Sequence, residues 1–196
     1  MDTIQPIILA AGASRRFGTC KLLLRYRGTS LLQRCADTLA ALALPAPLIV
    51  SGAWHRQLAD AHPQLALREH RDWRDGLGSS LAFAARQLPA HSEAALVLLA
   101  DQVAVTELDL QQLLQAWRDQ REARKTVCSF YTGRRGVPAI FPRHTFAQLQ
   151  QLHGDSGARA LLRSREAEVI EVPLANGAID IDTPQDWKNF GGDACN

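Results

Sequence analysis

The fold is decided by a short stretch near the N-terminus, Ile7-Ile8-Leu9-Ala10-Ala11-Gly12-Ala13-Ser14-Arg15-Arg16-Phe17-Gly18, with Lys21 close behind it. An apolar run passes here into small residues, whose backbone N–H groups can face a ligand, and then into basic side chains that suit a polyphosphate. The spacing is neither that of a P-loop nor that of a dinucleotide-binding fingerprint. Spacing alone leaves a second interpretation open, a glycine-containing turn whose arginines are solvated.

Beyond this stretch, short aliphatic runs alternate with longer amphipathic segments. The runs have the length of strands and lie at residues 7–9, 47–50, 65–67 and 94–99. Residues 31–42 and 108–117 place leucines on one helical face. This alternation predicts an α/β fold in three layers, with a mostly parallel, Rossmann-like sheet covered by helices on both faces.

From residue 127 the pattern changes to two short runs, 127–130 and 138–141, with glycines between them. This change predicts a hairpin-like extension of the sheet. Helices are expected at 143–152 and 157–163, and a last strand at 169–172. Thr183 stands directly before Pro184, a pair that is typical of a capped helix start.

The composition is that of an ordinary globular protein of 196 residues, with 46% hydrophobic and 21% charged residues. The length suits a single domain over residues 1–196. The formal net charge of +2 is too small to indicate nucleic-acid binding. No apolar stretch approaches the roughly 20 residues that span a bilayer, and the N-terminus lacks the basic region of a signal peptide. We therefore expect a cytoplasmic protein that does not associate with membranes.

Neither cysteines nor histidines show the spacing of a metal site. Reduced thiols are expected because no C-x-x-C pair occurs among Cys20, Cys35, Cys128 and Cys195. The six histidines likewise form no metal-binding pair, so each is expected at the surface or in a loop.

Aspartates stand where an α/β sheet binds its ligands, beyond the carboxyl ends of strands. Asp101 follows the run 94–99, and Asp180 and Asp182 are expected on one face of a late strand because side chains alternate along a strand. Carboxylate oxygens suit Mg²⁺, so Asp101 and Asp182 are the expected metal ligands, with Asp180 as the alternative. Without a cation these carboxylates would repel one another. The other interpretation of Asp182 is a carboxylate that stabilises a helix N-terminus.

Small residues also open a predicted helix at Gly76-Leu77-Gly78-Ser79-Ser80. They would let a base or ribose approach closely, although capping of the helix by Ser79 or Ser80 explains a serine equally well. Trp54 and Trp73 are interpreted as core aromatics in preference to pocket residues. Lys21 is expected on an exposed loop that contributes little to packing.

Together these motifs resemble one family. The first loop with Lys21 is similar to the signature L-A-[AG]-G-x-S-x-R-[MF]-G-x-x-K of the MobA-like NTP transferases, the nucleotidyltransferases that resemble molybdenum cofactor guanylyl- and cytidylyltransferases. Further matches to the cytidylyltransferase branch follow in the same order at residues 73–81, 98–102, 136–141, 154–159 and 180–184. The resemblance covers nearly the whole chain and implies the fold of nucleotide-diphospho-sugar transferases.

The resemblance also implies roles for single residues. The residues implied to bind the nucleotide are Leu9, Ala10, Ala11, Gly12, Ser14, Lys21, Gly78 and Ser79. Arg16 and Lys21 would neutralise the departing pyrophosphate, and Asp101 would act in catalysis and in binding the metal. Arg15 fills the variable position of the signature and is interpreted as a solvated surface residue.

The implied reaction is transfer of CMP from CTP to a phosphate on an acceptor, expected to be molybdopterin or its molybdenum form. CTP is expected because Ala11 stands where the guanylyl branch carries glycine. The product would pass to a molybdoenzyme or its chaperone. Two alternatives stay open: a guanylyl-, sugar-phosphate or alcohol-phosphate nucleotidyltransferase, and a non-catalytic nucleotide-binding partner of a molybdoenzyme.

Three residues depart from the family pattern. Val103 and Arg25 each replace a common proline, and His70 replaces a frequent asparagine. The change at Val103 leaves the metal site intact, whereas the changes at Arg25 and His70 put the acceptor and base contacts in question.

Overall fold

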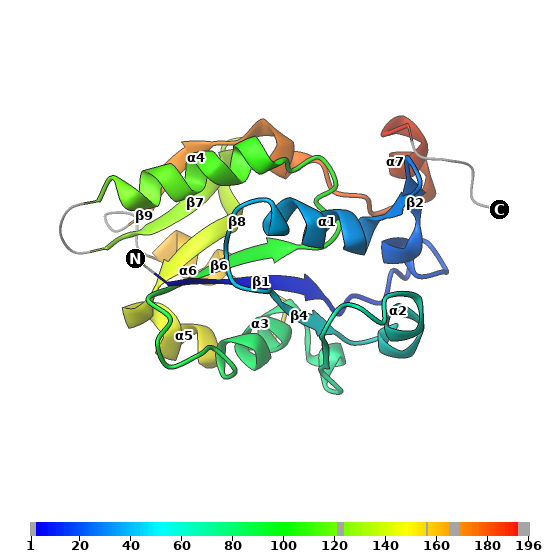
Figure 1. Ribbon diagram of the computed structural model, residues 1–196, viewed down its shortest axis with the longest axis horizontal. Coiled ribbons are helices and arrows are strands. Elements are labelled where there is room, and N and C mark those ends of the chain that lie inside the picture. Colours follow the sequence, from blue (N-terminus) through cyan, green and yellow to red (C-terminus); the bar gives the residue numbers. More distant parts are fainter. Residues whose placement is uncertain (1–2, 121–123, 156, 165–168, 192–196) are drawn as a thin grey trace.

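The computed structural model describes residues 3–120, 124–155, 157–164 and 169–191. A seven-stranded sheet runs through the molecule (Figure 1), in the strand order β5-β4-β1-β6-β8-β7-β9. Its strands are β1 (Ile4–Ala10), β4 (Leu48–Ser51), β5 (Leu67–Glu69), β6 (Ala94–Leu99), β7 (Thr126–Tyr131), β8 (Arg134–Pro142) and β9 (Val169–Pro173). Of these described strands, β8 alone runs antiparallel to its neighbours. The prediction of a mostly parallel sheet is confirmed.

Strand β1 lies inside the sheet and every one of its residues is buried. It pairs with β4 on one side and β6 on the other, so that Ile7 faces both Leu48 and Val97. Successive side chains enter opposite cores, with Ile8 in one and Ile7 and Leu9 in the other. A parallel strand that is buried on both faces reads as a continuous apolar run, which is why this stretch could be recognised in the sequence.

Helices cover both faces of the sheet (Figure 1). On one face α1 (Leu31–Ala40), α2 (His55–Ala61) and α4 (Glu107–Arg118) contribute Leu32, Leu39, Leu58, Leu110, Leu113 and Trp117 to the core. On the other face α3 (Leu77–Ala85), α5 (Phe146–Gln150) and α6 (Arg159–Ser164) contribute Leu81, Leu149 and Leu162. The three-layer arrangement is therefore confirmed.

The predicted hairpin is β7 paired antiparallel with β8, and β9 joins β7 at the edge of the sheet. Away from this hairpin, β2 (Arg25–Tyr26) and β3 (Thr29–Ser30) form a separate two-stranded ribbon next to α7, where Tyr26 contacts Trp187. A helix that begins at Pro184 is confirmed as α7 (Pro184–Asn189), in which Thr183 and Asp186 form a reciprocal capping box.

Two elements have bounds in the structure that differ from the predicted ones. The strand predicted at 65–67 begins only at Leu67, because turn hydrogen bonds from Leu65 N to the His62 oxygen and from Leu67 N to the Leu65 oxygen come first. The helix predicted at 143–152 is divided into the 3-10 turn η3 (Arg143–Thr145) and α5.

Two of the histidines lie in loops, as the sequence predicts, but are not at the surface. His62 and His70 are buried, and their Nε2 atoms lie 2.6 Å from the hydroxyl of Ser30 and 2.8 Å from that of Ser79. Cys20, Cys35 and Cys128 are unpaired thiols, as expected, and Cys195 lies outside the described residues. Burial raises the pKa of Cys35 to about 12, so its thiol stays protonated at neutral pH.

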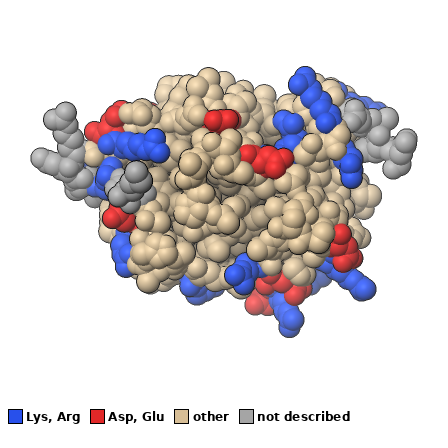
Figure 2. All heavy atoms as spheres, in the orientation of Figure 1, with Lys and Arg blue, Asp and Glu red and all other residues tan. Residues whose placement is uncertain are grey.

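None of the helices in the described ranges has both the length and the apolar character needed to cross a membrane. On the face drawn in Figure 2, side chains of both charge signs lie mainly around the rim and uncharged residues cover the centre.

Candidate nucleotide-binding site

The loop after β1 is held in shape by Ser14, which adopts a left-handed conformation with φ 51°. Its carbonyl accepts hydrogen bonds from the backbone nitrogens of Phe17 at 2.9 Å and Gly18 at 3.1 Å, and its hydroxyl accepts one from Lys21 N at 3.4 Å. These bonds fold residues 14–18 into a tight turn and direct the chain back toward the sheet. Ser14 thus shapes the loop as well as lining it.

A second set of contacts fixes the loop from the end of β4. The indole nitrogen of Trp54 donates to the Ala13 oxygen at 3.0 Å, and Ala53 N donates to the Ala11 oxygen at 3.2 Å. Trp54 is only partly buried, so its role is to brace the loop as well as to pack. This hydrogen bond could not be predicted from a local sequence pattern, because the two residues are 41 positions apart.

Two adjoining clefts open over the loop. The first has a volume of about 340 Å³ and is lined by Leu9, Ala10, Gly12, Ser14, Arg15, Arg16, Lys21, Leu22, Asp101 and Asp182. The second, of about 530 Å³, shares Leu9, Gly12 and Arg15 with the first and adds Ala11 and Trp73. Arg15 therefore borders both clefts, in addition to being exposed as expected. The basic first cleft suits phosphates, and the second suits the rest of a nucleotide.

The centre of the site is the ammonium group of Lys21. Its Nζ lies 2.6 Å from Oδ2 of Asp101 and 3.1 Å from Oδ1 of Asp182, and Arg16 Nη2 lies 2.6 Å from Oδ2 of Asp182. Three segments of the chain thus meet around one cation: the loop after β1, the turn after β6 and the segment before α7.

The expectation that Lys21 lies on an exposed loop is wrong. Only 8% of the residue is exposed, because the turn made by Ser14 leads it back under the loop. Lys21 and Arg16 also supply positive charge between the carboxylates of the site. The expected repulsion between the aspartates is therefore offset by these two side chains.

The electrostatics follow from this arrangement. Burial lowers the pKa of the Lys21 ammonium, but the carboxylates of Asp101 and Asp182 outweigh burial and raise it above its usual value. Burial raises the pKa of Asp182, whereas hydrogen bonds and charges of Lys21 and Arg16 outweigh it and hold that pKa low. For Asp180, burial and then the charges of Asp101 and Asp182 raise the pKa to about 6.

Asp180 and Asp182 do point to the same side, although not from a strand. Residues 179–183 form an extended segment between the 3-10 turn η5 (Ala175–Ala178) and α7. Ile181 N donates to the Asp101 oxygen at 3.3 Å, and the Ile181 side chain is buried against Trp187 and Val103. The aspartates on either side of Ile181 are therefore turned away from this small core. Val103, where the family commonly has proline, helps to build it.

The backbone of Asp182 is fixed by the helix that follows. Its nitrogen donates to Oδ2 of Asp186 at 3.1 Å, within the capping box that starts α7. Both interpretations of Asp182 are thus compatible: it precedes a helix N-terminus, and its side chain binds Lys21 and Arg16.

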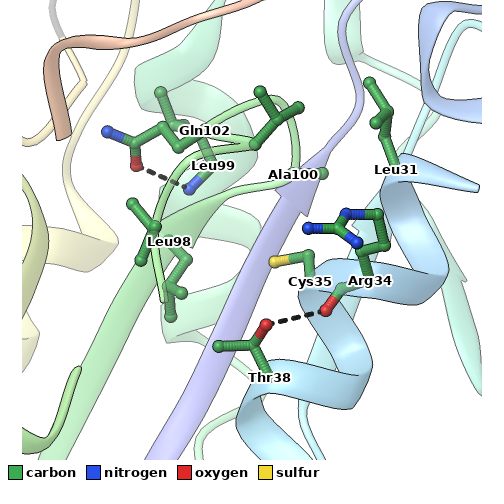
Figure 3. A pocket seen from close by; sticks show the side chains of 10 residues that line it. Leu31, Arg34, Cys35, Thr38, Leu98, Leu99, Ala100 and Gln102 are labelled. Atoms are coloured by element: carbon green, nitrogen blue, oxygen red, sulfur yellow. Dashed lines mark hydrogen bonds between the residues drawn. The ribbon is translucent and has the colours of Figure 1, made fainter. Parts of the chain in front are cut away.

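Gln102 holds the turn that presents Asp101. Its side-chain oxygen accepts from Leu99 N at 3.4 Å, a bond drawn in Figure 3, and its nitrogen donates to the Val137 oxygen at 2.7 Å and the Gly177 oxygen at 3.0 Å. This side chain is buried and ties the end of β6 to β8 and to η5. Behind the turn, Figure 3 shows Cys35 of α1 beside a small cavity with a volume of about 20 Å³.

The start of α3 differs from what the resemblance implied. Gly78 N donates to the Gly154 oxygen at 2.7 Å, and a Cβ at Gly78 would lie 2.7 Å from the His153 oxygen, so this glycine permits close backbone contact. Ser79 binds His70 and Ser80 donates back to the Gly76 oxygen at 3.4 Å, so neither serine caps the helix. In the described chain, α3 lines the second cleft through Leu77 and Ser80.

Within the described residues, no three acidic, histidine or cysteine side chains come together as a ready metal cluster. Mg²⁺ commonly takes one or two carboxylates and completes its shell with water and phosphate oxygens, so Asp101 and Asp182 are sufficient donors. The neighbouring Asp180 has a buried Oδ1 without a hydrogen-bond partner. This donor set fits a hard divalent cation.

The chain matches one family model and is similar to two known proteins over most of its length. The family model of the MobA-like NTP transferase domain matches residues 6–169. Nicotine blue oxidoreductase of Paenarthrobacter nicotinovorans is 31% identical over 194 residues, covering 93% of this chain and 94% of its own. The purine catabolism protein PucB of Bacillus subtilis is 28% identical over 194 residues, covering 92% of each chain.

Among solved structures, Rv0371c of Mycobacterium tuberculosis superposes with a TM-score of 0.82 at 25% identity, covering 96% of this chain and 97% of that one. A second structure of Rv0371c is a complex with manganese. This chain and Rv0371c therefore share one fold over almost the whole length of both chains.

Gln102 provides a first test of the site. Gln102→Met keeps the size of the side chain but leaves the Val137 and Gly177 oxygens without their donor, so the free energy of unfolding should fall by about 1–3 kcal/mol. Binding of a nucleoside triphosphate should weaken as well, because Asp101 loses its support. Denaturant titration and calorimetry measure both effects, with Gln111→Met on the exposed face of α4 as control. Unchanged triphosphate affinity would limit Gln102 to a structural role.

Lys21 provides a second test. Lys21→Met leaves the buried carboxylate of Asp101 without its cation, and breaking such a pair costs about 3–5 kcal/mol when burial is complete. Asp101 keeps some exposure, so we expect a loss toward the low end of that range, together with loss of triphosphate binding. The exposed Lys188→Met is the control. Unchanged stability would contradict the central position given to Lys21.

Proposed function

This chain belongs to the MobA-like NTP transferase family, and we propose that it transfers CMP from CTP to a phosphate on an acceptor and releases pyrophosphate. The observation that carries the proposal is the meeting of Arg16, Lys21, Asp101 and Asp182 at one cleft. Two of these residues oppose phosphate charge and two can hold a metal, which is the equipment that nucleotidyl transfer requires.

The reaction needs alignment and charge stabilisation more than covalent help from the protein. An oxygen of the acceptor phosphate attacks the α-phosphorus of the nucleotide and forms a new P–O bond. The bond to the β-phosphate breaks, and pyrophosphate leaves with its electron pair. Lys21 and Arg16 lie where they can stabilise this departing charge, and Gly12 lets the loop backbone approach the phosphates.

Charge balance favours a metal in the working complex. Three aspartates stand beside the two cations, and a triphosphate would bring still more negative charge. Asp101 and Asp182 would hold Mg²⁺, which would offset the charge of the phosphate oxygens. The manganese complex of the related Rv0371c supports a divalent ion at such a fold. Gly78 and Ser79 stay predicted contacts of the base and the ribose, and Gly76, Leu77 and Ser80 of the same segment line the second cleft.

The acceptor is proposed to be molybdopterin or its molybdenum form, and a molybdoenzyme or its chaperone the recipient of the product. The support is the sequence resemblance to the cytidylyltransferase branch. The names of the two curated relatives do not specify this acceptor. Incubation with Mg²⁺, each NTP and each candidate acceptor, followed by measurement of pyrophosphate, tests the proposal; no release under any combination would refute it.

The same assay tests which nucleotide base the protein prefers. Ala11 is buried and its methyl group borders the second cleft, so it should narrow the space for the base. We expect CTP to be turned over faster than GTP, and Ala11→Gly to reduce that preference. Ala13→Gly, in the same loop, controls for added backbone freedom. Equal rates with CTP and GTP for the unmodified protein would contradict this role.

The two aspartates should act as a unit. Asp101→Asn, Asp182→Asn and the double variant should all show similarly low rates of pyrophosphate release, because residues that hold one ion are not additive. Each single variant should also lower the melting temperature without metal, since it weakens the contacts of Lys21. Asp60→Asn, an exposed residue of α2, is the control. If Asp182→Asn kept full activity and full magnesium dependence while Asp101→Asn lost both, the second metal ligand would have to be Asp180 instead of Asp182.

A further inference from the structure

The ribbon of β2 and β3 is closed by a two-residue turn whose first residue is an arginine. Arg27 and Gly28 both adopt left-handed conformations, with φ of 52° and 82°. Turns of this kind favour asparagine, aspartate or glycine, because other side chains are rarely tolerated at positive φ. Arg27 therefore keeps its place at a conformational cost that closure of the ribbon does not require, and it is exposed at the tip.

Three arginines are ordered around the ring of Tyr26 and the turn. The guanidinium carbons of Arg27 and Arg34 lie 5.1 Å and 4.9 Å from the centre of that ring. Arg25 Nη1 donates to the Gly28 oxygen across the ribbon at 3.2 Å. A guanidinium that stacks on a ring uses its face, so the N–H donors in its plane stay available for carboxylates. The three cations are thus held in position before any ligand binds.

The positive charge of these arginines is not compensated. No acidic side chain of the described residues forms an ion pair with any of the three, and Nε of Arg34 is buried without a hydrogen-bond partner. Asp186, in the adjoining α7, is bound within the capping box, and Asp37, one turn after Arg34 in α1, accepts from Gln33 at 2.7 Å. Figure 2 shows Lys and Arg side chains gathered over the end of the molecule where β2 and α7 lie in Figure 1.

This arginine surface lies outside the nucleotide clefts, since neither cleft is lined by Arg25, Arg27 or Arg34. Beneath the ribbon, Tyr26 packs on the small core that contains Ile181, and Phe17 of the loop after β1 packs on the same core. The loop after β1 and the segment before α7 therefore rest on the core that carries the ribbon. A partner bound at the ribbon would lie next to the nucleotide site without filling it.

We propose that Arg25, Arg27 and Arg34 dock an acidic segment of another protein, in which several Asp or Glu side chains follow one another. Each guanidinium offers paired N–H donors whose geometry matches one carboxylate. Such docking uses residues that the proposed reaction does not need. It also gives a role to Arg25, which stands where the family commonly has proline.

Two other polyanionic partners fit this surface less well. A nucleic acid gains from an open aromatic ring on which a base can stack, but the ring of Tyr26 is already contacted by Arg27, Arg34 and Phe190. A membrane surface gains from apolar side chains beside the cations. The large hydrophobic residues that are exposed in the described chain lie elsewhere, at Leu77, Leu108 and Ile179.

The test uses a fluorescent octaglutamate peptide and the full chain. Anisotropy should show saturable binding that weakens as salt is raised from about 50 to about 200 mM, because salt screens exposed charges. Arg25→Gln, Arg27→Gln and Arg34→Gln should each weaken binding about 2- to 5-fold, and the triple variant about 10-fold or more, which is the scale of exposed ion pairs. Unchanged affinity in the triple variant would overturn the proposal.

A second triple variant removes the same charge from other elements. Its changes are at exposed arginines of β5, α4 and α6, namely Arg68→Gln, Arg118→Gln and Arg163→Gln. Peptide affinity should stay within about 2-fold in this variant, because exposed charges far from the peptide are largely screened. An equal loss in both triple variants would show that net charge alone attracts the peptide. Displacement of the peptide by CTP would place it in the nucleotide cleft, and either result would overturn the proposal.

Arg27→Gly separates docking from folding. Glycine suits a φ of 52° better than arginine does, so Tm should stay level or rise while the peptide binds more weakly. Octathymidylate and vesicles of phosphatidylserine with phosphatidylcholine are the remaining probes, and both should bind more weakly than the peptide. Tighter binding of either one, lost in the triple variant of Arg25, Arg27 and Arg34, would assign the surface to nucleic acid or to membrane and refute an acidic protein partner.

Discussion

The site depends on one interaction, the contact of the buried Lys21 ammonium with the carboxylates of Asp101 and Asp182. An ammonium group that leaves water must be compensated, and neither aspartate is near it in sequence: they lie 80 and 161 residues away. The ion pairs therefore require the β1 loop, the turn after β6 and the segment before α7 to come together. Folding of the sheet and assembly of the site are the same event.

The supports of this contact are mostly uncharged. Ser14 shapes the loop, Trp54 braces it, Gln102 fixes the turn of Asp101, and the capping box of α7 fixes the backbone of Asp182. The side chains of Ser14, Trp54, Gln102 and Asp186 form these hydrogen bonds with backbone atoms. The ion-paired side chains of Lys21, Asp101 and Asp182 are thereby held beside the first cleft in a rigid frame, which is the condition for electrostatic preorganisation.

Much of this could be predicted from the sequence, where the signal is local. The buried strand β1, the position of Asp101 after β6, the hairpin and the start of α7 each follow from periodicity or from a cap. The burial of Lys21 and the hydrogen bond of Trp54 could not be predicted, because they depend on pairings between distant segments. The roles of Gly78 and Ser79 were obscured for the same reason, since their neighbours His153, Gly154 and His70 come from other parts of the fold.

The site also draws on a segment beyond the part of the chain that the family model matches. The family model ends at residue 169, and it covers the loop after β1, Trp73 and Asp101. Asp180 and Asp182 lie beyond it, yet Asp182 lines the first cleft and binds Lys21. One short segment, positioned by the buried Ile181, thus carries both aspartates, and Asp182 of this segment reaches the first cleft. Because the two aspartates share that backbone, any substitution that shifts the segment will also disturb the contact between Asp182 and Lys21.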